Sequence, residues 1–196
     1  SNSVAIGTLC GQTNQGQECV AIGRSAGAEG QKESSIAVGL AAGSLAQGTA
    51  AIAIGILSGN SNQGSNSVAI GTLCGQTNQG QDCVAIGGSA GRFQQASSAV
   101  AIGNNAGSLR QSYASVAIGF NAGGTGQGES SVAVGINAGS TGQASNSLAL
   151  GINAGSIGQN FRSTAIGSFC GEEFQGTNSL AIGSQCGRYS QGSYSV

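Results

Sequence analysis

Large and small side chains alternate in a short segment that recurs along the whole chain. In Ser67-Val68-Ala69-Ile70, for example, small and β-branched residues alternate, and the segment ends at Gly71. Strict alternation over a few residues, bounded by glycine, is typical of a short β-strand, whereas an amphipathic helix needs apolar residues three and four positions apart. The pattern therefore predicts short strands that are separated by turns.

This segment and its variants return every 16 residues without insertion or deletion. They begin at Val4, Val20, Ile36, Ile52, Val68, Val84, Val100, Val116, Val132, Leu148, Thr164, Leu180 and Val196. With the Val4 position as slot 1, twelve full repeats share the consensus [VIL]-A-[IVL]-G-x-x-[AC]-G-x-x-x-Q-G-x-x-S. Repeats that share one consensus in this way are stabilised by stacking on one another. We predict an all-β, parallel β-solenoid (β-roll) of twelve 16-residue coils.

We expect residues 1–196 to form a single continuous array of this solenoid, which is an excerpt of a longer chain or a filament subunit. Four slots never vary: alanine in slot 2, glycine in slots 4 and 8, and glutamine in slot 12. Alternate residues of a strand point to opposite faces, and we assign the Val and Ile side chains of slots 1 and 3 to the coil interior. Slots 2 and 16 then form an outward face of small residues.

An outward residue that is alanine in every repeat indicates the close approach of another sheet or chain. Slot 2 therefore predicts an oligomer interface, made of Ala5, Ala21, Ala37, Ala53, Ala69, Ala85, Ala101, Ala117, Ala133, Ala149, Ala165 and Ala181. The invariant glutamines predict an amide ladder, in which each side chain bonds its neighbours one coil above and below. This ladder comprises Gln15, Gln31, Gln47, Gln63, Gln79, Gln95, Gln111, Gln127, Gln143, Gln159, Gln175 and Gln191.

Composition and charge argue against several classes of function. The chain has 37 glycines and no histidine, and its net charge is −1, so it lacks the cationic surface that nucleic-acid binding requires. No apolar stretch reaches the roughly 18 residues of a membrane helix, and we expect no membrane insertion in this segment. Without histidine and with only seven scattered carboxylates, we expect no enzyme activity, no cofactor and no metal site.

The six cysteines occupy two slots only. Slot 7 holds Cys10, Cys74, Cys170 and Cys186, and slot 16 holds Cys19 and Cys83. Because no C-x-x-C cluster is present, we expect free thiols that replace small core residues. Two alternatives stay open: a disulfide between Cys170 and Cys186, which are one coil apart in the same slot, and bridges between chains through Cys19 and Cys83 on the predicted interface.

The repeats S-V-A-I-G at 115–119, S-S-V-A-V-G at 130–135 and N-S-L-A-L-G at 146–151 resemble the YadA-like head repeats of trimeric autotransporter adhesins. The resemblance covers the whole chain. It implies a left-handed parallel β-roll, three copies of which pack around a common axis in a surface-exposed, adhesive head. The N-A-G at 121–123 and the N-Q-G at 78–80 are also similar to repeat arrays in fibre proteins of viruses and phages.

Together these features predict a structural segment of an extracellular, cell-surface or virion-surface fibre with adhesive potential. We expect it to self-associate through the small residues of slots 16 and 2, which we call the Ser/Ala face. We expect a homo-oligomer, with a trimer favoured and an end-to-end filament as the alternative. A second hypothesis is an adhesin head that binds a host-surface glycan or protein through outward Arg92, Phe93 and Arg110. An ice-binding solenoid is a third and less favoured hypothesis, because the threonines form no regular rank.

Overall fold

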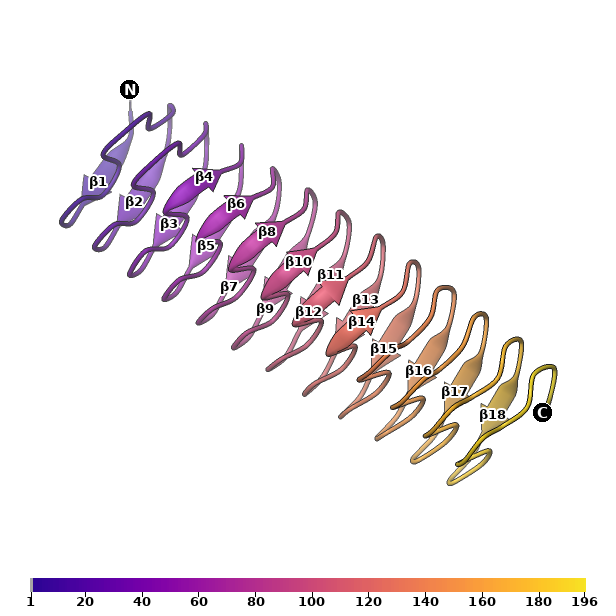
Figure 1. Cartoon of the computed structure of the whole chain (residues 1–196). Helices are drawn as coiled ribbons and strands as arrows, with labels where there is room; N and C mark the ends of the chain where they lie inside the picture. The colour runs from indigo at the N-terminus through magenta and orange to yellow at the C-terminus, as the bar shows by residue number, and fades with distance from the viewer. Residues whose placement is uncertain (1) are drawn as a thin grey trace. The chain divides into compact units, whose positions relative to one another are not determined.

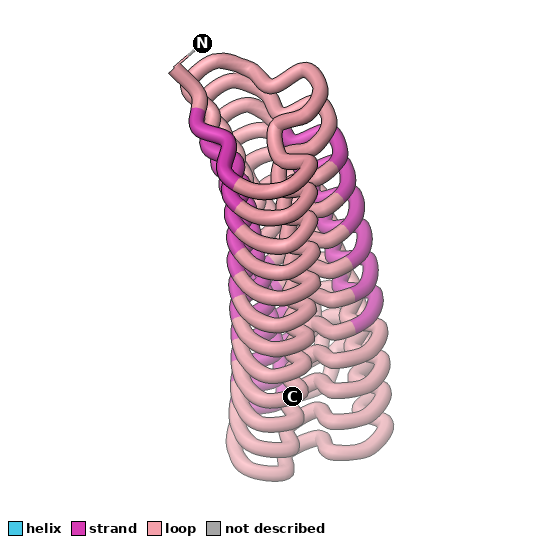
Figure 2. The backbone as a smooth tube through the Cα atoms, turned by 90° about the vertical axis from the view of Figure 1, so that its left-hand side faces the viewer, coloured by secondary structure: helices cyan, strands magenta, loops and turns pink. Residues whose placement is uncertain are grey.

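The computed structural model of the chain describes residues 2–196, and none of these residues is helical. The chain divides into two compact units, Ser1–Ser98 and Ala99–Val196. In each unit the backbone winds through successive coils, and most of each coil is turn or loop (Figure 2). The prediction that residues 1–196 form one continuous array stays a prediction.

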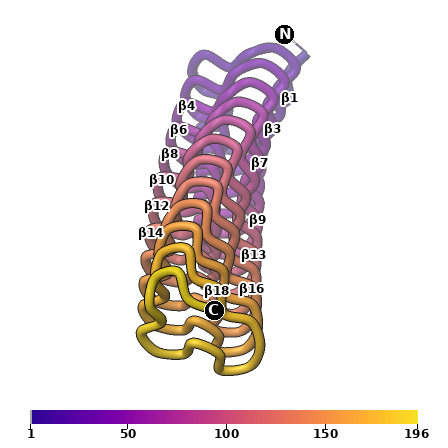
Figure 3. The backbone as a smooth tube through the Cα atoms, turned by 90° about the vertical axis from the view of Figure 1, so that its right-hand side faces the viewer, coloured from indigo at the N-terminus to yellow at the C-terminus, as the bar shows by residue number. Residues whose placement is uncertain are grey.

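In the described part of the first unit, six strands coincide with slots 1–3 of successive repeats. They are β1 (Val4–Ile6), β2 (Val20–Ile22), β3 (Ile36–Val38), β5 (Ile52–Ile54), β7 (Val68–Ile70) and β9 (Val84–Ile86). Slots 10–12 form a second set, made of β4 (Leu45–Gln47), β6 (Ser61–Gln63), β8 (Thr77–Gln79) and β10 (Phe93–Gln95). Each set is a parallel sheet, and the two sheets lie on opposite sides of the coils (Figures 1 and 3).

The second unit repeats this architecture. Its strands in slots 1–3 are β11 (Val100–Ile102), β13 (Val116–Ile118), β15 (Val132–Val134), β16 (Leu148–Leu150), β17 (Thr164–Ile166) and β18 (Leu180–Ile182). The strands in slots 10–12 are β12 (Leu109–Gln111) and β14 (Thr125–Gln127), and isolated bridges such as Thr141 to Ile157 continue this side in the later coils. The strand order follows the order of the repeats, so each coil stacks on the next.

Neighbouring strands pair parallel and in register, one repeat apart. Val116 is paired with Val132 and Ala117 with Ala133, for example, and the turns between strands also bond from coil to coil. The amide of Gly23 donates to the carbonyl of Ile6 at 2.8 Å, which joins two coils just beyond the strand. These pairings confirm an all-β parallel β-solenoid with about 16 residues in each coil.

Each coil closes because its corners adopt left-handed backbone conformations. Slots 6, 11 and 15 have positive φ in one repeat after another, as at Asn121 (φ 55°) and Asn146 (φ 57°), where asparagine is well tolerated. Slot 4 also has positive φ, as at Gly23 (φ 123°), which favours glycine. It needs glycine for a second reason as well, since a Cβ at Gly23 would lie only 2.6 Å from the carbonyl oxygen of Gly39 in the next coil. Glycine in slot 4 therefore allows the coils to stack closely.

The coil interior is filled by slots 2, 7, 12 and 16. In the slot 1–3 strands from β2 onward, the middle residue is buried while the residues on either side are half-buried or exposed, as in β13, where Ala117 is buried between Val116 and Ile118. The prediction that the Val and Ile side chains of slots 1 and 3 fill the interior is therefore wrong. A 16-residue coil has little internal width, and it accommodates alanine, serine, cysteine and one glutamine but not two rows of branched side chains.

Candidate interaction surface

The twelve alanines of slot 2 do not form an outward face. Eleven of them, from Ala21 to Ala181, are buried within the chain's own coils, and only Ala5 in the first coil is exposed. The prediction of an oligomer interface at slot 2 is therefore wrong, because these methyl groups already contact the interior of their own coil. The methyl of Ala117, for example, is 3.2 Å from the point where a Cβ on Gly123 would lie.

The invariant glutamines cross this interior from one sheet to the other. Eleven of them, from Gln31 to Gln191, donate through Nε2 to the slot-1 carbonyl of the same coil at 2.7–3.1 Å. Because slot 12 and slot 1 lie on opposite sides of the coil, each side chain ties the two sides together. Sequence reasoning did not predict this bond within the coil.

The predicted ladder between coils is present at five steps. Nε2 donates to the Oε1 of the next glutamine at 3.1–3.2 Å from Gln15 to Gln31, Gln47 to Gln63, Gln79 to Gln95, Gln143 to Gln159 and Gln159 to Gln175. Six buried Oε1 atoms in the described coils accept no hydrogen bond, including those of Gln47 and Gln127. They lie against the slot-8 glycines, since a Cβ on Gly43 would be 2.7 Å from Gln47 Oε1. Glycine in slot 8 therefore makes room for the glutamine.

The outward face of the first sheet is aliphatic. Slots 1 and 3 present two parallel rows of Val, Ile and Leu side chains, interrupted only by Thr164, and no charged residue occurs in either row. Several of these side chains are well exposed, including Ile54 (38 %), Ile118 (36 %) and Leu150 (41 %). Slot 5 follows these rows around the adjacent corner. We call the rows of slots 1 and 3 the aliphatic face, together with the apolar residues of slot 5, which are Leu40, Ile56, Phe120, Ile136 and Ile152.

The aliphatic face is widest over three successive coils of the second unit. There, slot 5 is also apolar and exposed, with Phe120 at 54 %, Ile136 at 49 % and Ile152 at 48 %. The nine side chains of this patch are Val116, Ile118, Phe120, Val132, Val134, Ile136, Leu148, Leu150 and Ile152. Exposed apolar patches of several hundred Å² are typical of interaction sites, and this patch is the candidate functional site.

The three residues predicted to bind a ligand do not form one described site. Arg92 and Phe93 belong to the first unit, where the guanidinium lies 4.6 Å from the phenyl ring and Nε donates to Gln76 Oε1 at 3.0 Å. Arg110 belongs to the second unit and is exposed next to Gln111 in β12. Their role in ligand binding stays a prediction.

A larger aromatic and charged cluster lies in the second unit, and sequence reasoning missed it. Arg188 donates to Glu172 at 2.7 Å, and its guanidinium lies 5.3 Å from the ring of Phe169 and 5.0 Å from that of Tyr189. The hydrogen bond to the Glu172 carboxylate raises the pKa of the Arg188 guanidinium above its usual value. The ion pair could have been predicted from the sequence, because Glu172 and Arg188 occupy the same slot in adjacent repeats.

All six cysteines are free thiols, and four of them are buried in the coil interior. The prediction that Cys19 and Cys83 face an interface is wrong, because both side chains point inward; Cys19 Sγ donates to the carbonyl of Lys32 at 2.9 Å. Burial raises the pKa of the Cys74 thiol to about 12, and burial also raises that of Cys170. These thiols therefore occupy the place of small core residues.

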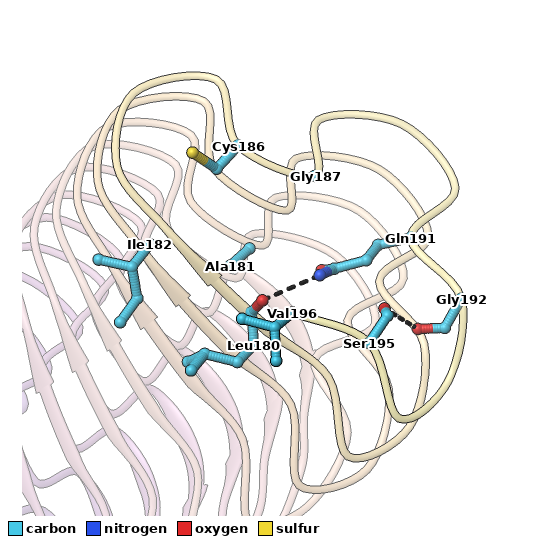
Figure 4. A pocket seen from close by; sticks show the side chains of 9 residues that line it. All are labelled: Leu180, Ala181, Ile182, Cys186, Gly187, Gln191, Gly192, Ser195 and Val196. Atoms are coloured by element: carbon cyan, nitrogen blue, oxygen red, sulfur yellow. Dashed lines mark hydrogen bonds between the residues drawn. The ribbon is translucent and has the colours of Figure 1, made fainter.

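The last described coil bears a cavity of about 510 Å³. Its lining includes interior side chains of that coil, such as Ala181, Cys186 and Gln191, and Gln191 Nε2 donates to Leu180 O at 2.9 Å across it (Figure 4). Within residues 2–196, no group of three or more His, Cys, Asp or Glu side chains is arranged to hold a metal ion. The described part of the chain also has no helix that could cross a membrane.

Comparison with known proteins returns no relatives. No protein-family model, no curated protein and no solved structure matches the chain. The aliphatic face and the coil interior are therefore the features from which a function is inferred.

Proposed function

We propose that the chain is a structural segment of a fibre and that it self-associates through the aliphatic face. The observation that carries the proposal is the pair of uncharged Val, Ile and Leu rows that remain exposed in coil after coil. This replaces the Ser/Ala face as the surface for association, because the alanines are already buried inside the coils. Association would remove the exposed rows from water, which is the main favourable term in protein association.

A second copy of the chain is the partner that fits this face. Parallel strands place identical side chains about 4.8 Å apart along each row, and such rows interdigitate only with a surface of the same spacing. Another copy has that spacing because its coils are stacked at the same distance, and a symmetric contact uses the same patch on both partners. The absence of charge in slots 1 and 3 also means that these rows bring no like charges together when two copies meet.

The apolar area is sufficient for association. From the exposed fractions of its side chains, the nine-residue patch offers roughly 400 Å², and the aliphatic face of the second unit offers roughly 700 Å². A stable interface buries about 800 Å² on each partner. At about 25 cal/mol per Å², burial of this face contributes well over 10 kcal/mol before the cost of association, which is about 4–15 kcal/mol.

The coil interior suits a mechanical role. Each coil is bonded to the next through both strands and turns, and a glutamine ties its two sides together. Repeat proteins built in this way gain stability from every nearest-neighbour contact along the array. We propose that the fibre is extracellular or on a surface, as the resemblance to YadA-like head repeats implies, and that the trimer is the favoured assembly.

The test compares two triple variants that remove similar exposed apolar groups from different faces. The first carries Phe120→Ser, Ile136→Ser and Ile152→Ser on the aliphatic face. Serine is already present in slot 5 at Ser168 and Ser184, so the coil accepts it. The control carries substitutions to serine on the outward side of the second sheet, at Leu45, Leu109 and Ile157, which are 43 %, 40 % and 40 % exposed. Serine is likewise present in this slot at Ser61.

Light scattering coupled to size-exclusion chromatography measures the mass of each protein over a range of concentrations. We expect an oligomer for the parent chain and the control, and an apparent dissociation constant raised about 1,000-fold for the first variant, since each lost side chain contributes about 1.4 kcal/mol or more. A parent chain that stays monomeric at every concentration, or two variants that dissociate equally, would refute the proposal.

A further inference from the structure

The geometry points to a redox-active pair: we propose that Cys170 and Cys186 form a reversible disulfide that links two adjacent coils of the second unit. Both cysteines occupy slot 7, and they are one repeat apart. The strands that precede them, β17 and β18, are paired in register with the same offset. The amide of Gly171 donates to the carbonyl of Cys186 at 2.8 Å, so the two cysteines remain aligned beyond the strands.

The spacing between the two residues fits a disulfide. Aligned residues in adjacent parallel coils have Cα atoms about 4.8 Å apart, and disulfides span about 4.4–6.8 Å between Cα atoms. Residues in the same slot also point in the same direction from the coil. The charge of one thiolate opposes ionisation of the other, and this raises the pKa of Cys170 beyond the effect of its burial.

No other pair among the six cysteines has this relation. The slot-7 neighbours of Cys74 are Ser58 and Ala90, and the slot-7 neighbour of Cys10 in the following coil is Ala26. Cys19 and Cys83 lie in slot 16, four repeats apart. The chain therefore contains one candidate pair together with thiols that serve as internal controls.

The two thiols differ in access, which sets the order of the steps. Cys186 is exposed and lines the cavity of its coil (Figure 4), whereas Cys170 is fully buried. With a small disulfide such as oxidised glutathione as the oxidant, the Cys186 thiolate attacks one sulfur, the S–S bond of the oxidant breaks, and one glutathione thiolate leaves. The Cys170 thiolate then attacks Sγ of Cys186 and releases the second glutathione. The two cysteines each lose a proton, the pair is oxidised, and the glutathione disulfide is reduced to two thiols.

The resulting bond would be easily reduced. In-register parallel residues also keep their Cβ atoms about 4.8 Å apart, whereas a disulfide holds them at about 3.8 Å. Drawing the atoms together strains the coils, and strained disulfides have more oxidising potentials than structural ones. The bond would therefore respond to the redox poise of the surroundings. This inference is independent of the proposed function.

The test exposes the folded chain to mixtures of reduced and oxidised glutathione, followed by alkylation, mass spectrometry and peptide mapping. The variants are Cys170→Ala and Cys186→Ala, with Cys74→Ala as the matched control. Alanine is the usual residue of slot 7, so all three variants keep the repeat pattern. A non-reducing gel separates bonds within a chain from bonds between chains.

We expect the number of free thiols to fall from six to four, with a peptide pair that joins Cys170 to Cys186 within one chain. This product should be absent from Cys170→Ala and Cys186→Ala and unchanged in Cys74→Ala. The inference is overturned if oxidation stops at a glutathione adduct on Cys186, if the bond forms between chains, or if six thiols are alkylated after treatment. Each of these results is measured whether the chain is monomeric or oligomeric, so the two proposals fail separately.

Discussion

The role of the glutamines is tested by the same substitution at two adjacent residues. Gln95 is buried and donates to the carbonyl of Val84 at 3.0 Å, while Gln94 beside it is exposed. We consider Gln95→Met and Gln94→Met, because methionine has a similar length and flexibility but no amide. Only the first substitution removes an interior hydrogen-bonding group.

The cost follows from the bonds that Gln95→Met removes. The part-buried Val84 carbonyl loses the Nε2 donor, and loss of a partner from a partly desolvated group costs about 1–3 kcal/mol. Gln79 Nε2 also loses the Gln95 Oε1 acceptor at 3.1 Å, worth about 1 kcal/mol, although it keeps its bond to Val68 O. We expect Gln95→Met to lower the free energy of unfolding by about 2–4 kcal/mol and Gln94→Met to change it by less than about 0.5 kcal/mol.

Urea unfolding followed by circular dichroism measures this difference. With a dependence of about 2 kcal/mol per molar urea, the midpoint of Gln95→Met should fall by about 1–2 M relative to the parent chain. Equal midpoints for the two variants would show that the amide contributes nothing in the interior. The glutamine would then be invariant for a reason other than the bonds across the coil.

Two further predictions test the interior of the coil. Ala117→Val should destabilise the chain by about 1–3 kcal/mol because it overfills a closed interior, whereas Val116→Ile on the aliphatic face should cost less than about 0.5 kcal/mol. Thermal unfolding of both variants measures the difference. If Val116→Ile were the more destabilising of the two, slot 1 would lie inside the coil. The pKa of the Cys74 thiol is raised to about 12 in the folded chain, above the value of about 8.5 for a free thiol. The contribution of this neutral thiol to the free energy of unfolding is therefore fully present below pH 8.5 and is lost as the pH rises toward 12. The urea midpoint should therefore fall between pH 9 and pH 11, and this fall should be smaller in Cys74→Ala; an identical fall in both would contradict the assignment.

The solenoid could be predicted from the sequence because its evidence is periodic. A fixed step of 16 residues, alternation ending at glycine and an invariant glutamine each specify a local feature that repeats. The parallel register and the coil-to-coil glutamine bonds follow from these features. The stacking of Cys170 above Cys186 was visible for the same reason, since equal slots in adjacent repeats are neighbours in space.

The inward and outward faces could not be assigned in this way. Alternation shows that slots 1 and 3 share a face, but it does not show which face is inside. The usual rule that branched aliphatic residues are buried favoured the wrong choice, and the invariance of Ala69 and Ala117 was attributed to a partner chain instead of to their own coil. Invariance was the better signal, because the enclosed slot 2 accepts only one side-chain size, while slots 1 and 3 vary among Val, Ile, Leu and Thr.

Periodicity along the chain thus specifies the strands of slots 1–3 and the partner of every residue one coil away, because these are local or repeat by a constant offset. The second set of strands, in slots 10–12, was not predicted from the sequence. The width of the closed coil is a three-dimensional property. It depends on where the corners at slots 4, 6, 8, 11 and 15 bring the two sheets, and on the one glutamine that spans the space between them. That width admits alanine and excludes valine, and it is the reason that the aliphatic rows lie on the surface, where another copy of the chain can bury them.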